Sequence, residues 1–278
     1  AKSVQIMKKF VFCKLCLIVF GALVAVQTSS AGNWNKNSAS KKSGDEQYTK
    51  IDRAGQGIQW RLRPTSLISR AEQIMFVPDP LGSDDQVIQF EVSDGDCGEN
   101  KQPDGSKWSD CDGGKDRAEI NNRLPERGEI WYQWEIFFPE DYLSIFPAKN
   151  IHSQYKLISE KNKKKNSKKY LFFEEIKYGL FFRGKKLVDD VRGKWTKIQV
   201  HANWTTEKNG FLRVYANDEL KFRNDGYATL RPGYDAVRTH HGIYRIDLYR
   251  YLKSRNLKAA PKQTVLYKNF SISTTEPN

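Results

Sequence analysis

Hydrophobic and polar residues alternate with a period of two over many short segments of this chain. In a β-strand successive side chains point to opposite faces, so this pattern predicts strands with one face in a core and one outside it. Turn signals such as Asn209-Gly210 and Asp225-Gly226 separate several of these segments. The segments read DQVIQFEV, RAEINN, EIWYQWEIFF, IHSQYKLI, YGLFFRG, WTKIQVHANW, FLRVYAN and VLYKNFSIS. Together they predict an all-β fold, a β-sandwich or jelly roll.

Only a few short helices are expected. The two candidates are SLISRAEQI at residues 66–74 and DLYRYLKS at residues 247–254. The length from residue 49 to residue 278 suits one all-β domain better than two small ones. We therefore predict a single jelly-roll domain over residues 49–278.

The first part of the chain has the pattern of an export signal. An apolar run, Leu15–Val26, follows several lysines and ends before Ser29-Ser30-Ala31, small residues of the type that signal peptidases cleave after. We expect residues 1–31 to be a removed signal peptide and the polar residues 32–48 to be a flexible segment. The protein is then expected to be secreted or periplasmic.

The charge of the chain indicates an anionic partner. Its formal net charge is +13, and removal of the four lysines among residues 1–31 leaves +9. Such a balance suits an acidic polysaccharide, a nucleic acid or an anionic surface. No nucleic-acid motif occurs, and the aromatic residues lie mainly in strand patterns. We expect a polysaccharide partner, no nucleic acid, no membrane, and a monomer.

Two cysteines, Cys97 and Cys111, bracket a polar, glycine-rich loop. In an exported chain they predict a disulfide, which would stabilise the fold by about 3 kcal/mol in the chain-entropy model. A cysteine nucleophile is the alternative, but neither residue has a histidine close by in the sequence.

The same loop is acidic. Asp94, Asp96 and Asp112 are weak candidates for calcium ligands, because calcium prefers oxygen ligands on flexible turns. Their spacing does not match an EF-hand, so we favour a solvated disulfide loop and expect no required cofactor.

A lysine run, KNKKKNSKK at residues 161–169, lies between two predicted strands. Charge runs usually form solvated loops. The functional alternative is a cationic rim that attracts an anionic polymer and weakens as salt screens it.

Three predicted strands carry polar rows of an unusual kind. The rows are Arg117, Glu119 and Asn121; His152, Gln154 and Lys156; and His240, Gly242 and Tyr244. An outward sheet face is ordinarily polar for solubility alone. These residue types nevertheless suit a groove that recognises carboxylates and sugar hydroxyls, which is the interpretation we favour.

Several motifs resemble those of a known enzyme family. RAEI, WYQWEIFFP, SQYK, GKWTKIQVHANW, NGFLRVYANDEL and HHGIYR follow the order and spacing found in the polysaccharide lyase superfamily that includes heparin lyase I and glucuronan lyase. The resemblance covers residues from about 90 to 275. It implies a concanavalin-like jelly roll whose concave sheet binds a uronic-acid polymer and cleaves it by β-elimination.

The resemblance also implies roles for single residues. Arg117 resembles the family's arginine near the substrate carboxylate, Gln154 its strand glutamine, and Tyr244 its proposed proton donor. Lys156 stands where the family usually has a catalytic histidine, and His240 stands where a lysine precedes the tyrosine by four. The base is therefore either His240 or Lys156.

The remaining assignments are substrate contacts and alternatives. Glu119, Asn121, His152, His201 and Arg245 are the predicted substrate-binding residues. A non-catalytic carbohydrate-binding module or lectin would keep the groove without needing a proton donor. A glycoside hydrolase on a similar sandwich would need two facing carboxylates, for which Glu119 and Glu135 are candidates.

Overall fold

A computed structural model describes residues 62–65, 67–101, 106–122, 124–162 and 166–277, all within one compact unit that spans residues 31–278. The predicted signal peptide, residues 1–31, and the predicted flexible segment, residues 32–48, lie outside the described residues. No helix among the described residues is long and apolar enough to cross a membrane.

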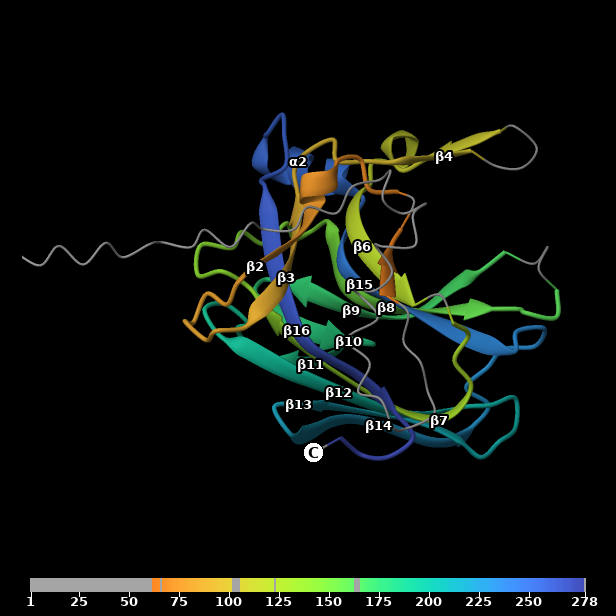
Figure 1. Cartoon of the computed structure of the whole chain (residues 1–278). Helices are drawn as coiled ribbons and strands as arrows, with labels where there is room; N and C mark the ends of the chain where they lie inside the picture. Colours follow the sequence, from red (N-terminus) through yellow and green to blue (C-terminus); the bar gives the residue numbers. More distant parts are fainter. Residues whose placement is uncertain (1–61, 66, 102–105, 123, 163–165, 278) are drawn as a thin grey trace, which may run out of the picture. The chain divides into compact units, whose positions relative to one another are not determined.

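The fold is a two-sheet antiparallel sandwich, as the alternation predicts (Figure 1). In order across the first sheet the strands are β1 Leu62–Pro64, β6 Asp116–Asn122, β15 Ala236–Ile246, β8 Lys149–Ile158, β9 Lys168–Ile176, β10 Gly179–Phe182 and β11 Lys185–Val188. We call this the site sheet.

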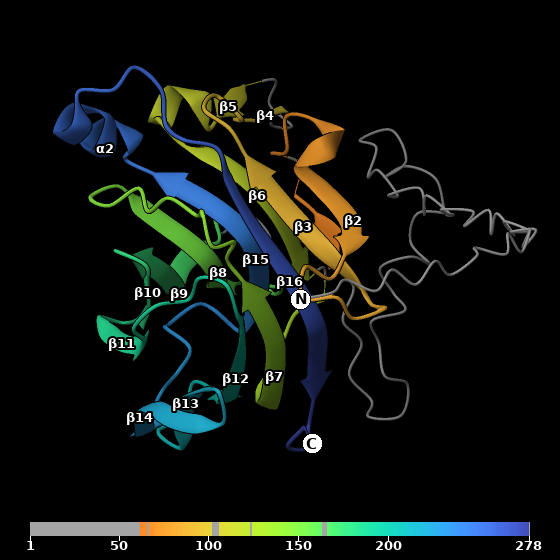
Figure 2. The same cartoon turned by 90° about the vertical axis from the view of Figure 1, so that its left-hand side faces the viewer.

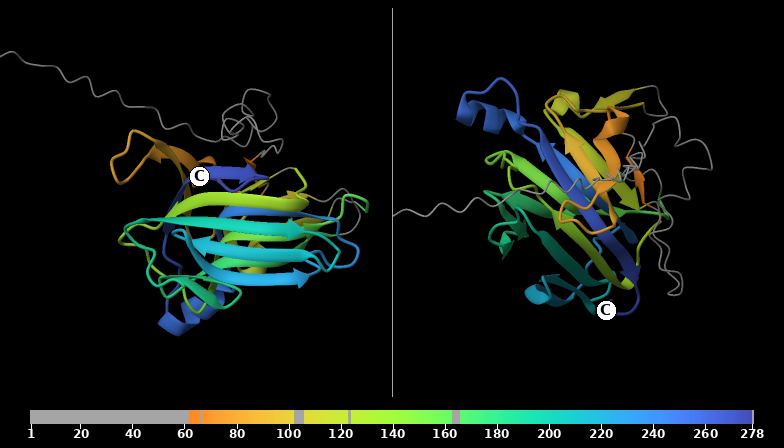
Figure 3. Two further views of the ribbon diagram at one scale, coloured as in Figure 1. Left: turned by 90° about the horizontal axis from the view of Figure 1, so that it is seen from below. Right: turned by 60° about the vertical axis from the view of Figure 1, so that its left-hand side comes forward.

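The second sheet packs against the site sheet (Figures 2 and 3). In order across it the strands are β14 Glu219–Tyr227, β13 Gly210–Ala216, β12 Trp195–Trp204, β7 Gly128–Phe137, β16 Gln263–Ser273, β3 Gln86–Val92 and β2 Ile74–Pro78. Figure 3 (left) shows β12, β13 and β14 side by side along this sheet.

The core lies between the two sheets. Ala118 and Ile120 of β6 are fully buried there, together with Tyr155 of β8 and Trp134 of β7. Because the side chains alternate, burial of these residues turns Arg117, Glu119 and Asn121 of β6 to the other face of the site sheet.

A bulge in β8 breaks the alternation that the sequence predicts. Ile151 pairs with Glu174 and Ser153 with Phe173, so His152 is an extra residue between them. The His152 ring lies 4.7 Å from the Phe138 ring, inside the core. The prediction that His152 contacts substrate is therefore wrong, since a bulge residue changes the face on which the strand presents its side chains.

The helix predictions have different outcomes. Residues 247–254 are confirmed as a helix by α2, Leu248–Arg255. The predicted helix at 66–74 is wrong for its described residues, 67–74: they contain one 3-10 turn, Ala71–Gln73, and Ile74 begins β2. Buried Gln73 explains the turn, because its side chain bonds the backbone of Ser69 and of Arg117 instead of facing solvent.

The disulfide is confirmed. Cys97 and Cys111 are bonded, with Cα atoms 5.1 Å apart. Between them lies the hairpin of β4 Glu99–Lys101 and β5 Lys107–Ser109. This hairpin and α2 lie at the same end of the structure (Figures 1 and 2), where Leu248 N donates a hydrogen bond to Gly114 O.

Candidate active site

Three neighbouring strands of the site sheet bring the predicted residues together. His240 of β15 pairs with Asn121 of β6 on one side and with Gln154 of β8 on the other. Tyr244 of β15 pairs with Arg117 of β6. Residues paired across antiparallel strands share a face, so these five side chains lie on one surface.

Glu119 is the centre of the polar network on this surface. Its carboxylate accepts a hydrogen bond from Arg117 Nη1 at 3.1 Å and another from Gln154 Nε2. His240 Nδ1 lies 3.9 Å from the same carboxylate. All four residues are buried, and the two hydrogen bonds to Glu119 hold Arg117 and Gln154 in fixed positions.

Each side-chain nitrogen of Arg117 donates a hydrogen bond to a carboxylate of the protein. Its Nε and Nη2 atoms donate to the two carboxylate oxygens of Asp110, and Nη1 donates to Glu119. The guanidinium carbon also lies 3.9 Å from the centre of the Tyr244 ring. Arg117 therefore positions the Tyr244 ring through a buried cation–π contact.

Lys169 joins the site from β9. Its ammonium donates a hydrogen bond of 2.7 Å to the Tyr244 hydroxyl. Lys169 as a whole is exposed, but its ammonium is partly desolvated. Desolvation lowers the pKa of Lys169, and the nearby positive charges of Arg117 and Lys156 lower it further, to about 8. Burial raises the pKa of Tyr244, although Arg117 acts in the opposite direction, so the hydroxyl stays protonated near neutral pH.

The two candidate bases line a cavity of about 180 Å³ on the same face. Burial lowers the pKa of His240 well below its usual value, and Lys156 and Arg117 lower it further. Burial also lowers the pKa of Lys156, while Glu119 acts in the opposite direction. Near neutral pH His240 is therefore an uncharged imidazole that can accept a proton.

His201 is not part of this surface. It belongs to β12 of the second sheet, where its ring stacks on Trp131 at 3.9 Å and bonds Glu129 at 2.8 Å. The predicted substrate contact at His201 is wrong, since one strand's alternation does not tell which sheet the strand joins.

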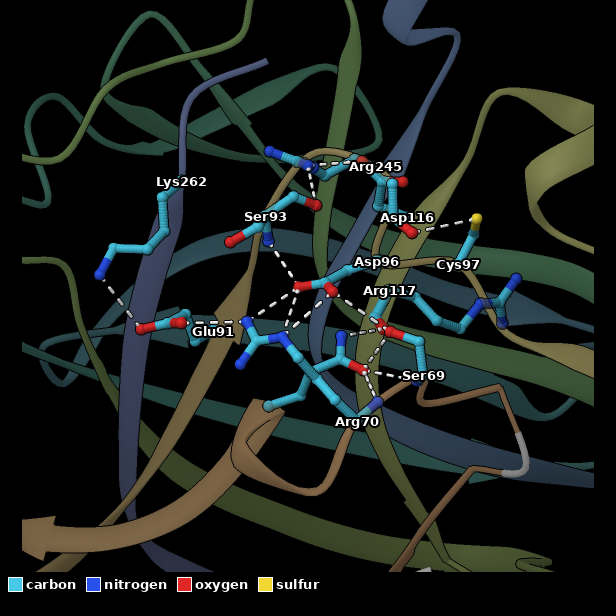
Figure 4. Close-up of polar contacts among 12 residues, drawn as sticks. Ser69, Arg70, Glu91, Ser93, Asp96, Cys97, Asp116, Arg117, Arg245 and Lys262 are labelled. Carbon is cyan, nitrogen blue, oxygen red and sulfur yellow. Dashed lines mark hydrogen bonds and ion pairs between the residues drawn. The ribbon is translucent and has the colours of Figure 1, made fainter. Parts of the chain in front are cut away.

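Arg245 is also a structural residue (Figure 4). It is completely buried, bonds the Asp116 carboxylate, and donates to the carbonyls of Ser93 at 2.8 Å and Pro261 at 2.7 Å. Its predicted role in substrate binding is wrong, because it follows Tyr244 in the strand and points to the opposite side.

The three calcium candidates do not converge. Asp96 bonds Arg70 Nη2 at 2.9 Å and the Ser93 amide at 2.7 Å (Figure 4), Asp94 accepts from the Ala260 amide, and Asp112 is exposed. Within the part of the chain that the structure describes, no three His, Cys, Asp or Glu side chains gather closely enough to hold a metal ion.

Glu119 and Glu135 do not face each other. Glu135 lies on β7 of the second sheet and accepts a hydrogen bond from Asn269 at 2.6 Å. Glu119 lies on the site sheet, so the paired carboxylates that a glycoside hydrolase requires are not formed by these two residues.

Lys169, Arg238 and Asp110 belong to the site but are not among the residues that the sequence predicts. Arg238 stands two residues before His240 and lines the same cavity, so the alternation along β15 contained the signal. Lys169 is the last residue of the lysine run, which predicts a solvated loop, and nothing in the sequence indicates that Asp110 pairs with Arg117.

Comparisons with known proteins agree with this fold. A family model described as polysaccharide lyase matches residues 30–270. Among solved structures, the endo-β-1,4-glucuronan lyase of the fungus Trichoderma reesei matches with a TM-score of 0.52 at 11% identity, covering 80% of this chain and 92% of that one. The alginate lyase Aly36B matches with a TM-score of 0.51 at 10% identity, covering 88% and 93%.

At such low identities the two structures show a shared fold alone. A search among curated proteins gives no significant match. The family model, in contrast, spans most of the chain. The chain therefore belongs to the polysaccharide lyase family.

Proposed function

We propose that this enzyme cleaves a uronic-acid polysaccharide by β-elimination on the face of the site sheet that carries Glu119. The observation that carries the proposal is the pair formed by Tyr244 and Lys169, with a hydroxyl oxygen and an ammonium 2.7 Å apart beside Arg117. The fold shared with a glucuronan lyase and an alginate lyase supports a uronate substrate.

In the proposed reaction a base removes the proton from C5 of the uronate ring. The C5–H electron pair forms the C4=C5 double bond while the bond from C4 to the glycosidic oxygen breaks, and an acid protonates that oxygen. No water and no oxidant is consumed. The enzyme must supply one base, one acid and positive charge for the developing enolate.

Tyr244 is the proposed acid. Lys169 donates to its oxygen, so the hydroxyl proton is available to the leaving oxygen. When the proton leaves, the charged ammonium of Lys169 and the adjacent guanidinium of Arg117 stabilise the tyrosinate. The raised pKa of Tyr244 keeps the proton in place until substrate arrives.

His240 is the proposed base, with Lys156 as the alternative. Both line the cavity on the Tyr244 face, and the lowered pKa of His240 leaves its imidazole uncharged near pH 7. Gln154 and Asn121 flank His240 in the pairing register and are proposed to contact sugar hydroxyls.

The decisive experiment incubates the protein with glucuronan, alginate, heparin and chondroitin and follows the ultraviolet absorbance of the unsaturated product. Tyr244→Phe is expected to lose at least about 100-fold in turnover, whereas Tyr249→Phe, on the exposed side of α2, retains it. His240→Ala is expected to lose more turnover than Lys156→Ala. Cleavage without a rise in absorbance, or full activity of Tyr244→Phe, would reject the proposal.

Two further features belong to the proposal. Lysine and arginine side chains supply the positive charge, so we expect no metal requirement, and exhaustive chelation should leave turnover unchanged.

The Cys97–Cys111 disulfide supports an oxidising location outside the cytoplasm. Thiol trapping of protein recovered from the producing cells tests this location.

A further inference from the structure

Three cations stand in one row across three adjacent strands of the site sheet. Lys156 of β8 pairs with Arg238 of β15 on one side and with Lys169 of β9 on the other. Like charges placed directly opposite each other destabilise a sheet. Among the described residues no carboxylate forms an ion pair with any of these three side chains. We call this set the cationic row.

The cavity beside the row contains polar atoms without protein partners. Within the described part of the chain, Asn121 Oδ1, Thr65 Oγ1, His240 Nδ1 and Arg238 Nε are buried and accept or donate no hydrogen bond. Asn121, Thr65 and His240 are each more than nine-tenths buried. Buried polar atoms are nearly always satisfied in folded proteins, so this cavity has the features of a ligand site.

The charge distribution indicates which ligand fits. Arg117, the arginine expected to bind the substrate carboxylate, is engaged by Asp110 and Glu119. Arg238 lines the cavity, and no carboxylate among the residues that the structure describes pairs with it. A guanidinium fork matches the two oxygens of a carboxylate, and the amide and hydroxyl of Asn121 and Thr65 match the hydroxyls of the same ring.

We propose that Arg238, with Lys156, binds the carboxylate of a second uronate ring, next to the ring that is cleaved at Tyr244. This inference rests on the proposed function and deepens it, because it names a polymer in which acidic rings neighbour one another. Arg238 is then the residue that selects such a polymer, and Arg117 positions Tyr244 instead.

The test is direct binding, measured by calorimetry in the Tyr244→Phe background. The probes are a glucuronan tetrasaccharide and the same tetrasaccharide with its carboxyl groups reduced. Arg238→Gln is expected to weaken binding of the charged tetrasaccharide at least about tenfold and to leave binding of the reduced one unchanged. Arg250→Gln, on the exposed side of α2, removes the same charge elsewhere and should change neither.

Three outcomes would overturn the inference. Arg238→Gln binds the charged tetrasaccharide as tightly as its parent does; it weakens both probes equally; or a sulfated, carboxyl-reduced tetrasaccharide depends on Arg238, which would assign the cavity to a sulfate ester. If Arg238→Gln misfolds, Arg238→Lys replaces it in the test, because lysine keeps the charge but lacks the guanidinium fork. Its affinity for the charged tetrasaccharide should lie between that of the parent and that expected for Arg238→Gln.

Kinetics separate this inference from the proposed function. In the otherwise unchanged enzyme, Arg238→Gln should raise KM more than it lowers kcat. If the charged tetrasaccharide binds in an Arg238-dependent way but unsaturated product never forms, the proposed function fails while the second uronate site stands.

Discussion

The ammonium of Lys169 donates a hydrogen bond of 2.7 Å to the hydroxyl oxygen of Tyr244. This contact joins β9 to β15 across the intervening strand β8. A tyrosinate formed at Tyr244 is therefore stabilised more strongly when Lys169 is charged than when it is neutral.

Lys169→Met is expected to lower kcat by about 100-fold, because the developing charge on Tyr244 loses one preorganised donor. Lys168→Met removes the same charge from an exposed neighbour and should retain nearly full kcat. Steady-state kinetics on the polymer that gives unsaturated product provides the measurement. Equal losses in the two variants would indicate general attraction of the polymer and not support of Tyr244.

The pH dependence of kcat/KM should reflect the same lysine. Since the pKa of Lys169 is lowered to about 8, its ammonium loses its proton as the pH rises through 8, and activity should fall there. Lys169→Arg, which stays charged, should extend the plateau to higher pH. A profile with the same alkaline limb in both proteins would contradict the role given to Lys169.

Gly242→Ala should destabilise the fold strongly. Gly242 has φ +137°, and an added Cβ would lie 2.1 Å from the backbone oxygen of Ala118 in the neighbouring strand. We expect a loss of more than about 2 kcal/mol in the free energy of unfolding from urea denaturation. Gly82→Ala is the matched control, since Gly82 also has positive φ but has no atom within 4 Å of the added Cβ; it should cost about 1 kcal/mol.

Removal of the disulfide should affect both stability and catalysis. The Cys97→Ser/Cys111→Ser variant is expected to lose about 2–4 kcal/mol in the free energy of unfolding. Cys111 follows Asp110, the buried partner of Arg117, so kcat should fall as well. Urea unfolding with and without a reductant measures the loss of stability. A reduced protein with unchanged kcat would show that Asp110 keeps its position without the disulfide.

Acid should destabilise the protein through its buried histidines. Burial lowers the pKa of His152 to about 3, so between pH 6.5 and pH 3 the unfolded chain takes up a proton that the folded one does not. Stability therefore falls with decreasing pH in this window, by up to about 1.4 kcal/mol per pH unit for this group. His152→Leu should flatten the dependence relative to the parent protein, and parallel curves for the two would refute this assignment.

The alternation of the sequence predicted most of the strands and the rows on β6 and β15, because burial of one face directly produces a period of two. It could not predict the bulge at His152, which depends on the partner strands of β8. It also misplaced the turn expected at Asp225-Gly226. These residues lie within β14, where Gly226 with φ +76° forms a bulge, and the turn between β13 and β14 is made by Asn217 and Asp218.

The sequence predicts which strands carry the candidate site, but it does not predict which of the site's charged side chains are paired with each other. Glu119, Gln154, His240 and Tyr244 share a surface because their own strands alternate, which the sequence contains. Whether an arginine is free or engaged depends on loops distant in the sequence. Asp110 of the disulfide loop occupies Arg117, and only the folded chain shows that Arg238 remains without such a carboxylate among the described residues.

The extra residue in β8 sets which side chains this strand presents outward. Asn150 points inward to Tyr142 and Gln263, whereas Gln154 and Lys156 point outward. Asn150 and Gln154 are four residues apart, so regular alternation at the present length would place them on one face, and the bulge at His152 places them on opposite faces. Loss of one residue at position 152 would restore regular alternation with both orientations kept, so the strand can tolerate a one-residue deletion at this point.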